Sequence, residues 1–262
     1  MTNKKIIISV IAPVHKEATF TSEMVTQCLM WEFVDIINKV NNWYNVKTDD
    51  GYIGWIYHNF LNEYIAVSDN SIILHNRINY IYNNVSKDSK VISVLSFGTI
   101  VPIIKKKSKY YQIEFLNGEA GYIPEQDVLP ENTRSKIIEL AKNLEGVPYL
   151  WGGKTSFGYD CSGFVQMVFK VAGIKLERDA SYQIKNNALK QIDFIESKPG
   201  DLIFFMDDSK IVHVGIIIGD GFIIHSYGKI TIDSIIKESS RYNQFIGSLN
   251  RVYMSIENFV EY

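Results

Sequence analysis

Cysteine is scarce in this 262-residue sequence, which contains only Cys28 and Cys161. Two cysteines are too few for the disulfide framework that supports a small secreted protein. Cys28 lies in the apolar stretch 28–31 and is typical of a small buried hydrophobic residue. Cys161 lies instead in a glycine-rich, polar-flanked turn. We therefore expect the two cysteines to stay unpaired, and Cys161 is the candidate for reactivity.

The sequence also lacks an excess of positive charge. It contains 27 Lys and Arg residues and 29 Asp and Glu residues, which give a net charge of -2. Proteins that bind nucleic acid or anionic membranes carry basic patches. The longest basic run is residues 105–107, which we expect in a solvated turn. No stretch approaches the roughly 20 apolar residues of a transmembrane helix. We therefore expect neither nucleic acid nor a membrane as a partner.

The beginning of the sequence imitates an export signal, since Lys4 and Lys5 precede the apolar residues 6–12. That apolar stretch is at the short limit for a signal, and residues 13–16 offer no small-residue cleavage site. Its β-branched residues favour a first strand over residues 6–12 instead. We expect a cytoplasmic protein, with an atypical export signal as the alternative.

Short strand-like segments separated by turns fill the first half of the chain. Residues 43–46 and 52–56 flank a turn at 49–51, and a similar pair of segments flanks a turn at Asn117-Gly118. Closely spaced short strands are typical of small barrels, and a repeated layout indicates an internal duplication. We predict two small β-barrels, over residues 1–66 and 67–131.

The second half, residues 132–262, combines helices and strands. Asn132 or Thr133 can cap a helix whose apolar residues between 137 and 144 recur at three-to-four spacing. A second helix begins near Cys161 and ends at Gly173. Strands are expected over 201–205, 212–218 and 221–225. Helices followed by strands predict an α+β domain.

Cys161 has the position that a nucleophile requires. A thiol at a helix N-terminus feels unpaired N–H groups and the positive end of the helix dipole, which favour the reactive thiolate. Ser162 and Gly163 follow and allow another chain to approach closely. The sequence therefore predicts covalent catalysis by a Cys161 thiolate. A buried structural cysteine is the alternative.

Two histidines lie on one predicted hairpin. His213 begins an apolar strand, and His225 ends the next strand after the turn 219–221. Adjacent antiparallel strands can place one imidazole as a base and the other as the group that orients it. One Cys and two His are also zinc ligands, but the CxxC and HExxH spacings are absent, so we expect no metal and no cofactor. The remaining histidines lie in the β section and are expected to be structural: His15, His58 and His75.

Several motifs occur together in this half: PYLWGG at 148–153, FGYDCSGFV at 157–165, PGDLIFF at 199–205 and HVGII at 213–217. In this order they resemble the NlpC-type family of papain-like cell-wall cysteine peptidases. The resemblance implies a papain-like catalytic domain over 132–262, with Cys161 as the nucleophile. It also implies His213 as the base, His225 as the residue that orients it, and Tyr149 near the oxyanion position.

The first half resembles two bacterial SH3-like domains, an arrangement similar to that of γ-D-glutamyl-L-diamino-acid endopeptidases (the dipeptidyl-peptidase VI branch). In that branch the first domain binds the free amine of the substrate. The motifs QCLMWE at 27–32 and GYIGW at 51–55 imply this role for Glu32 and Tyr52. The resemblance also implies a site for the D-Glu unit, formed by Asp160, Ser162, Asp179 and Ser181, with Ala180 as the alternative to Ser181.

The resemblance thus predicts a peptidase that cleaves L-Ala-γ-D-Glu-diamino-acid peptides of murein. A cleft closed at one end and the missing export signal both suit recycling of soluble peptidoglycan fragments inside the cell. We expect a monomer, although the sequence leaves the oligomeric state open. Whether diaminopimelate or lysine is preferred stays open. A wall-binding protein anchored through its SH3-like domains is the first alternative. Acyl transfer by the same catalytic centre is the second.

Overall fold

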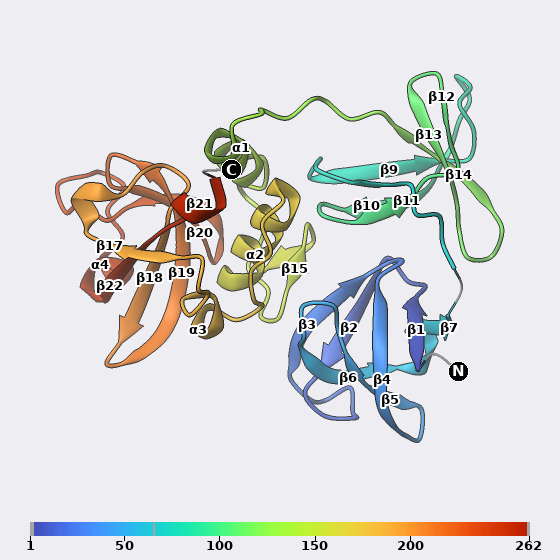
Figure 1. Ribbon diagram of the computed structural model, residues 1–262, viewed down its shortest axis with the longest axis horizontal. Coiled ribbons are helices and arrows are strands. Elements are labelled where there is room, and N and C mark those ends of the chain that lie inside the picture. Colours follow the sequence, from blue (N-terminus) through green and yellow to red (C-terminus); the bar gives the residue numbers. More distant parts are fainter. Residues whose placement is uncertain (1–2, 65, 261–262) are drawn as a thin grey trace. The chain divides into compact units, whose positions relative to one another are not determined.

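The computed structural model describes residues 3–64 and 66–260. The chain divides into two compact units, Met1–Val128 and Leu129–Tyr262, which are described separately below. The first runs from blue to green in Figure 1 and is built of strands, and the second runs from green to red and combines helices with a sheet. The α+β class that the sequence predicts for the second half is therefore confirmed.

The first unit contains a seven-stranded antiparallel sheet in the order β3-β2-β6-β5-β4-β1-β7. Its elements are β1 (Lys4–Ile7), β2 (Ile11–His15), β3 (Met24–Leu29), β4 (Phe33–Val40), β5 (Trp43–Lys47), β6 (Ile53–Tyr57), η1 (His58–Phe60) and β7 (Leu61–Glu63). The predicted single strand over residues 6–12 is wrong, because β1 and β2 are separate strands. β1 pairs with β4 and β7, whereas β2 pairs with β3 and β6.

A smaller five-stranded sheet, β10-β9-β14-β13-β12, and the pair β11-β8 complete the first unit. The strands are β8 (Ser71–Ile73), β9 (Ile78–Tyr82), β10 (Val91–Ser96), β11 (Ile100–Pro102), β12 (Lys105–Lys107), β13 (Tyr110–Glu114) and β14 (Ala120–Pro124). The turn predicted at residues 105–107 is wrong, since these lysines form the edge strand β12. All three are exposed, as lysines on an edge strand commonly are, and they discourage pairing with another chain.

The predicted hairpins occur in both sheets. β5 and β6 pair across the turn that contains Gly51, and β13 and β14 pair across the turn that contains Gly118. Both glycines have positive φ, at 84° and 85°, a conformation that other residues adopt only with strain. The glycines that the sequence places in these turns therefore allow the two hairpins to form.

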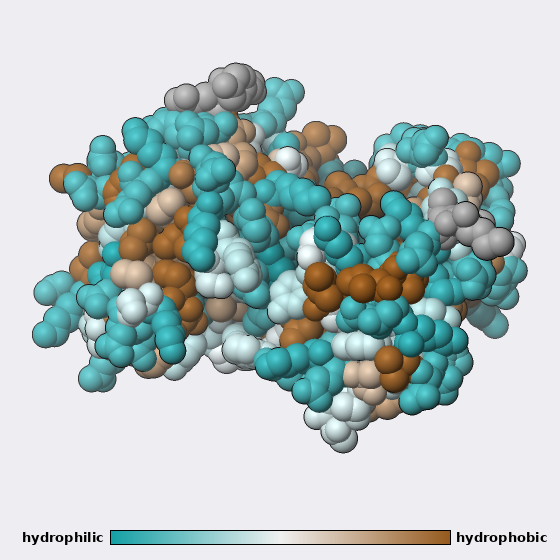
Figure 2. Space-filling model, turned by 60° about the horizontal axis from the view of Figure 1, so that its bottom comes forward, coloured by the Kyte–Doolittle hydropathy of each residue, from teal (hydrophilic) through white to brown (hydrophobic). Residues whose placement is uncertain are grey.

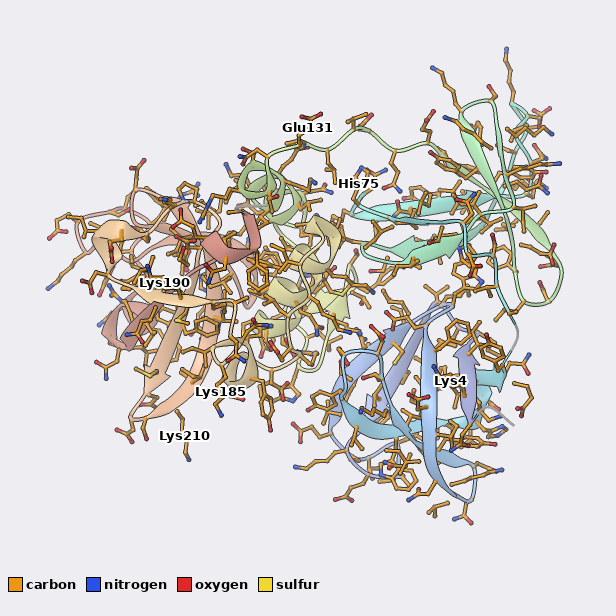
Figure 3. The ribbon with its side chains drawn as sticks, viewed as in Figure 1. Lys4, His75, Glu131, Lys185, Lys190 and Lys210 are labelled. Carbon is orange, nitrogen blue, oxygen red and sulfur yellow. The ribbon has the colours of Figure 1, made fainter. Side chains whose placement is uncertain are left out.

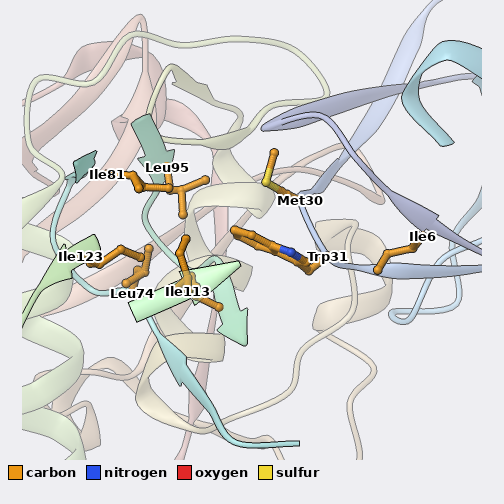
Figure 4. Close-up of a cluster of buried hydrophobic side chains, with 9 residues drawn as sticks. Ile6, Met30, Trp31, Leu74, Ile81, Leu95, Ile113 and Ile123 are labelled. Carbon is orange, nitrogen blue, oxygen red and sulfur yellow. The ribbon is translucent and has the colours of Figure 1, made fainter. Parts of the chain in front are cut away.

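One apolar cluster joins the two sheets of the first unit. Figure 4 shows Ile6, Met30 and Trp31 from the first sheet and its β3–β4 turn together with buried isoleucines and leucines of the second sheet. Trp31 also stacks on Phe115, with ring centroids 6.1 Å apart. Since the two sheets share this core, they form one compact unit. A domain boundary at residue 66 stays a prediction.

The second unit contains a six-stranded sheet, β17-β22-β18-β19-β20-β21. Its elements are α1 (Thr133–Asn143), β15 (Lys154–Thr155), β16 (Gly158–Tyr159), α2 (Cys161–Ala172), α3 (Ala180–Gln183), β17 (Lys190–Ile192), η2 (Phe194–Glu196), β18 (Leu202–Asp207), β19 (Lys210–Gly219), β20 (Phe222–Tyr227), β21 (Lys229–Ser234), α4 (Gln244–Ser248), β22 (Asn250–Ser255) and α5 (Glu257–Val260). Helix α2 packs against β19 and β20, so its buried face and the sheet form the core of this unit.

Local capping signals set the bounds of the two long helices. The side chain of Asn132 accepts the Ser135 N–H at the start of α1, which selects Asn132 of the two predicted caps. The side chain of Asp160 accepts the Gly163 N–H at the start of α2. Gly173 ends α2 in the left-handed conformation, with φ 93°. The predicted start and end of α2 are therefore confirmed.

Polar side chains dominate the exposed surface. Hydrophilic residues cover most of the face shown in Figure 2, with smaller hydrophobic patches between them. Lys185, Lys190 and Lys210 lie at separate places in the second unit rather than in one cluster (Figure 3). The described residues include no helix whose length and apolar content would let it cross a bilayer.

Candidate active site

Cys161 is the first residue of α2, and a tightly packed loop holds this helix end in place. A Cβ added at Gly163 would meet the backbone oxygen of Gly153 at 2.2 Å. The same oxygen accepts the Asp160 N–H at 3.0 Å. The loop can approach the helix this closely only because Gly163 has no side chain, as the Ser162-Gly163 pair indicated.

The carboxylate of Asp160 is the centre of a buried polar network beside the thiol. It accepts the N–H of Gly163 at 2.7 Å and the N–H of Gly152 at 3.0 Å. Arg178 donates to both carboxylate oxygens, at 2.9 and 2.5 Å, and also to Ser162 Oγ at 3.0 Å. Asp160 and Arg178 are 8% and 3% exposed. The network therefore neutralises a buried charge while it fixes the start of α2.

His213 and His225 face each other on neighbouring strands. His213 Nε2 lies 2.7 Å from His225 Nδ1, and the two rings are nearly perpendicular at 81°. β19 and β20 pair antiparallel beyond them, with Ile216 opposite Ile224. The predicted side-by-side arrangement on one hairpin follows from this pairing.

The thiol lies beside the strand that carries His213. Cys161 accepts a hydrogen bond from the backbone N–H of Val214, the residue that follows His213, and another from the N–H of Ser162. Cys161 as a whole residue is partly exposed. The predicted nucleophile, the predicted base and the second imidazole therefore lie in one place, an arrangement that can support covalent catalysis.

Burial determines the ionisation of this group. Burial, followed by the charge of Asp160, raises the pKa of the Cys161 thiol to about 12, although the N–H of Val214 opposes the shift. Burial, followed by His225, lowers the pKa of His213 to about 3. Both shifts favour uncharged forms. Both directions oppose the predicted resting thiolate and favour a thiol beside a neutral imidazole, because the helix terminus does not compensate for desolvation.

Tyr149 lies near the thiol, as the resemblance implies. Its backbone N–H donates to Gly228 O at 2.9 Å, which ties residue 149 to the turn between β20 and β21. Burial, and then the proximity of Cys161 and Asp160, raises the pKa of the Tyr149 phenol to about 12. The hydroxyl therefore keeps its proton at neutral pH and can donate a hydrogen bond to a developing oxyanion.

Three features near α2 escaped the sequence analysis. His225 Nε2 lies 3.2 Å from Asp233 Oδ2, and Asn243 donates to the same oxygen at 2.6 Å. Arg178 had no role of its own in the prediction. Gln183 is fully buried, and its amide donates to Ser162 O at 3.0 Å. Of these residues, only Asn243 could have been noticed in the sequence, because asparagine is a preferred N-cap residue and Asn243 precedes a short helix.

Among the described residues, no group of three or more His, Cys, Asp and Glu side chains is arranged to hold a metal ion.

Comparisons with known proteins agree with this geometry. Residues 146–248 match the NlpC/P60 family, and residues 14–61 match the bacterial dipeptidyl-peptidase Sh3 domain. A γ-D-glutamyl-L-lysine dipeptidyl-peptidase of Bacillus subtilis is 33% identical over 217 residues, which cover 77% of this chain and 71% of that protein. The chain belongs to the NlpC/P60 family. It is a cysteine peptidase with an SH3-like N-terminal region, as predicted.

Two further relatives extend the comparison of this NlpC/P60 peptidase. A γ-D-glutamyl-L-lysine dipeptidyl-peptidase of Bacillus cereus is 29% identical over 231 residues, which cover 79% of this chain and 68% of that protein. A crystal structure of an NlpC/P60 family protein from Bacillus cereus has a TM-score of 0.80 at 22% identity, and the match covers 95% of this chain and 98% of that one. This structural similarity supports the fold described above for this chain.

In an NlpC/P60 peptidase the assembled groups have complementary tasks. With Cys161 as the predicted nucleophile and His213 as the predicted base, the thiol can attack the carbonyl carbon of a scissile bond while its proton passes to the imidazole. Two groups that start uncharged would use the imidazole as a general base during this attack. The imidazolium could then protonate the leaving amine, and water could release the acyl group from the sulfur.

The residues predicted to bind the substrate occupy different surroundings. Ser162 is buried beside Cys161 and bonds to Arg178 and Asp160. Asp179 precedes the short helix α3, and Ser181 is exposed on its first turn, whereas Ala180 is partly buried. All of these belong to the peptidase unit of the NlpC/P60 protein. Their contacts with a substrate stay predictions.

The predicted amine-binding residues belong to the first unit. Glu32 lies in the turn between β3 and β4, and its carboxylate accepts the N–H of Leu29 at 3.0 Å. Tyr52 lies in the turn between β5 and β6 and is half-buried. Both residues fall within the segment that matches the dipeptidyl-peptidase Sh3 domain. Their role in binding stays a prediction.

Proposed function

We propose that this peptidase hydrolyses the bond between γ-D-glutamate and an L-diamino acid in murein peptides with a free N-terminal L-alanine. One observation carries the proposal: the match to the Bacillus subtilis dipeptidyl-peptidase extends over 77% of this chain. It therefore includes more than the peptidase domain that NlpC/P60 proteins share. The chain also matches a γ-D-glutamyl-L-lysine dipeptidyl-peptidase of a second species, Bacillus cereus.

Recognition of a free N-terminus is the central part of the proposal. A dipeptidyl-peptidase removes two residues from an unblocked end, so it needs a group that binds an ammonium ion. A carboxylate binds such a cation through a charge-assisted hydrogen bond. We assign this role to Glu32, with the hydroxyl of Tyr52 as a second partner. Asp160, Ser162, Asp179 and Ser181 are the proposed residues near the D-glutamate unit.

The test compares four peptides: L-Ala-γ-D-Glu-L-Lys, the same peptide with meso-diaminopimelate, and the N-acetylated form of each. Release of L-Ala-γ-D-Glu, measured by liquid chromatography and mass spectrometry, is expected only from the two free peptides. The Cys161→Ala variant controls for contaminating peptidases. Equal turnover of free and acetylated forms would remove amine recognition, and no turnover of any peptide would remove the substrate assignment.

The Glu32 assignment has its own test. Glu32→Gln keeps the size and the acceptor oxygen but loses the charge, so KM for the free peptide should rise at least tenfold with a smaller change in kcat. Glu63→Gln is the matched control, because Glu63 is an exposed carboxylate on β7 of the same sheet. If Glu32→Gln leaves KM unchanged, Glu32 does not bind the amine.

We also propose that the substrate pool consists of soluble peptides inside the cell and that the enzyme works there as a monomer. A requirement for a free N-terminus suits peptides that have already been released from the glycan. Fractionation of cells that express the tagged full chain should place it in the cytoplasm, and light scattering after gel filtration should give the monomer mass near 30.1 kDa. Retention of Cys161→Ala on murein sacculi would favour the anchoring alternative instead.

A further inference from the structure

A chain of four hydrogen bonds leads from the start of α4 to the catalytic imidazoles. Asn243 Oδ1 accepts the N–H groups of Phe245 and Ile246, at 3.1 and 3.3 Å. The amide Nδ2 then donates to Asp233 Oδ2 at 2.6 Å. The same carboxylate oxygen lies 3.2 Å from His225 Nε2. One further hydrogen bond then joins His225 to His213.

The direction of the first links determines the direction of the others. Backbone N–H groups can only donate, so the side-chain oxygen of Asn243 must face α4 and its NH₂ group must face Asp233. An ionised carboxylate only accepts, so His225 Nε2 must carry a proton. In a neutral His225 this leaves Nδ1 as an acceptor.

The same reasoning extends to His213. Because His225 Nδ1 accepts, the 2.7 Å hydrogen bond must come from a proton on His213 Nε2. The neutral His213 imidazole then has its lone pair on Nδ1. This nitrogen is the one that can take the proton of Cys161. A base with the opposite tautomer would hold a proton on the nitrogen needed for the attack and could not accept another.

We propose that Asp233, held by Asn243, is a positioning residue that selects the tautomer of His225 and, through it, the base-competent tautomer of His213. This assignment extends the reaction centre beyond Cys161, His213 and His225. It concerns the peptidase chemistry itself and does not depend on the peptide substrate proposed above.

The surroundings of Asp233 suit a permanent negative charge. The residue lies on β21, where its side chain is 18% exposed, and it borders an open groove of about 900 Å³. His225 and Asn243 donate to it, and these hydrogen bonds together with the charge of Arg241 hold the pKa of Asp233 below its ordinary value. Glu145 and Tyr242 are the other titratable groups that line the groove. The carboxylate therefore stays an acceptor throughout the neutral range.

The decisive measurement is the tautomer of each histidine, read from two-bond ¹H–¹⁵N correlation spectra of the ¹⁵N-histidine-labelled protein. In the wild type, both His213 and His225 should show a protonated Nε2 and an unprotonated Nδ1. Asp233→Leu removes the acceptor, so the two rings should populate the opposite tautomer. A purely structural Asp233 would leave the tautomers unchanged, and this result would overturn the proposal.

Kinetics provide the second readout. Loss of the hydrogen-bond partner that orients a metal-bound histidine typically costs about 10- to 100-fold in activity, and we take the same scale for His225. We expect this decrease in kcat for Asp233→Leu, with KM within about twofold of the wild-type value. Iodoacetamide alkylation of Cys161, which needs the same base but no peptide, should slow by a similar factor. An unchanged alkylation rate would contradict the proposal even if the peptide assignment were wrong.

Three further variants separate positioning from folding. Asp233→Asn keeps an acceptor oxygen without the charge, so it should retain more activity than Asp233→Leu and serves as the test if the leucine variant does not fold. Asn243→Ser keeps an N-cap for α4 but removes the amide donor, and should shift the tautomers partially. Glu238→Gln removes an exposed charge from the same segment and should change neither readout. Equal effects of Glu238→Gln and Asp233→Asn would overturn the proposal.

Discussion

Arg178 and Asp160 form a buried ion pair in which both guanidinium Nη atoms contact the carboxylate, at 2.9 and 2.5 Å. The arginine side chain is 2% exposed and the aspartate side chain 11%. Asp160 also caps α2, the helix that begins with the nucleophile. The charge that neutralises Asp160 therefore also determines the position of Cys161.

Removal of the arginine should be costly for stability. Arg178→Met leaves the Asp160 carboxylate buried without its cation, and breaking a buried pair typically costs about 3–5 kcal/mol. Urea unfolding of the intact chain measures this loss. Lys198→Met is the matched control, because Lys198 pairs with Glu257 at the surface, where an ion pair contributes little to stability. Similar losses in both variants would contradict this view of Arg178.

A side chain at Gly163 should disrupt the start of α2. A Cβ there would meet Gly153 O at 2.2 Å and Asp160 Oδ1 at 3.0 Å, so the loop or the helix must move. Overpacking of this kind typically costs about 1–3 kcal/mol. We expect Gly163→Ala to lower both the melting temperature and kcat, since the displaced helix end carries Cys161.

Gly173→Ala is the control for the Gly163 variant. A Cβ at Gly173 has open space, but its φ of 93° disfavours alanine. This variant should therefore lose stability through backbone strain while kcat stays close to wild type. A normal kcat in folded Gly163→Ala would show that the close approach of residue 153 does not position the thiol.

The resting thiol should be protonated at neutral pH. Because the pKa of Cys161 is raised to about 12, the thiolate fraction is negligible at pH 7 and grows only as the pH approaches 12. The difference in absorbance at 240 nm between the wild type and Cys161→Ser should stay near zero from pH 6 to pH 9. A step in this difference spectrum near pH 5 would instead reveal a thiolate–imidazolium pair.

Acid should destabilise the peptidase through His213. Its pKa in the folded protein, about 3, lies below the ordinary value of 6.5. Between these values the unfolded chain binds a proton that the folded chain does not, so stability falls as the pH decreases, by about 1.4 kcal/mol per pH unit at full effect. Above pH 6.5 the effect disappears.

Comparison of His213→Gln with wild type isolates this contribution. The free energy of unfolding, measured in urea from pH 4 to pH 7, should fall less steeply with acid in the variant than in the wild type. Val212→Gln places the same side chain at the neighbouring exposed position of β19 and should keep the wild-type slope. Parallel slopes for all three proteins would contradict the lowered pKa of His213.

Much of the local structure could be predicted because its causes are close in sequence. The cap at Asp160 and the glycine that ends α2 act over one helical turn. The turns at Gly51 and Gly118 require positive φ, which the sequence shows directly. The single strand expected over residues 6–12 was wrong because this segment is divided between two strands with different partners. β1 pairs with β4 and β7, and β2 pairs with β3 and β6.

The sequence alone determined the α+β class of the second half, the position of Cys161 at the start of a helix, and two histidines on one hairpin. These follow from periodicity and spacing, which express short-range backbone geometry. Only the tertiary structure decided which side chains complete the centre. Arg178 is 18 residues from Asp160, and Asn243 meets Asp233 across a loop. The tertiary structure also determines the pKa of Cys161. Desolvation of the sulfur depends on every chain segment packed around it, and a local sequence pattern does not contain this information.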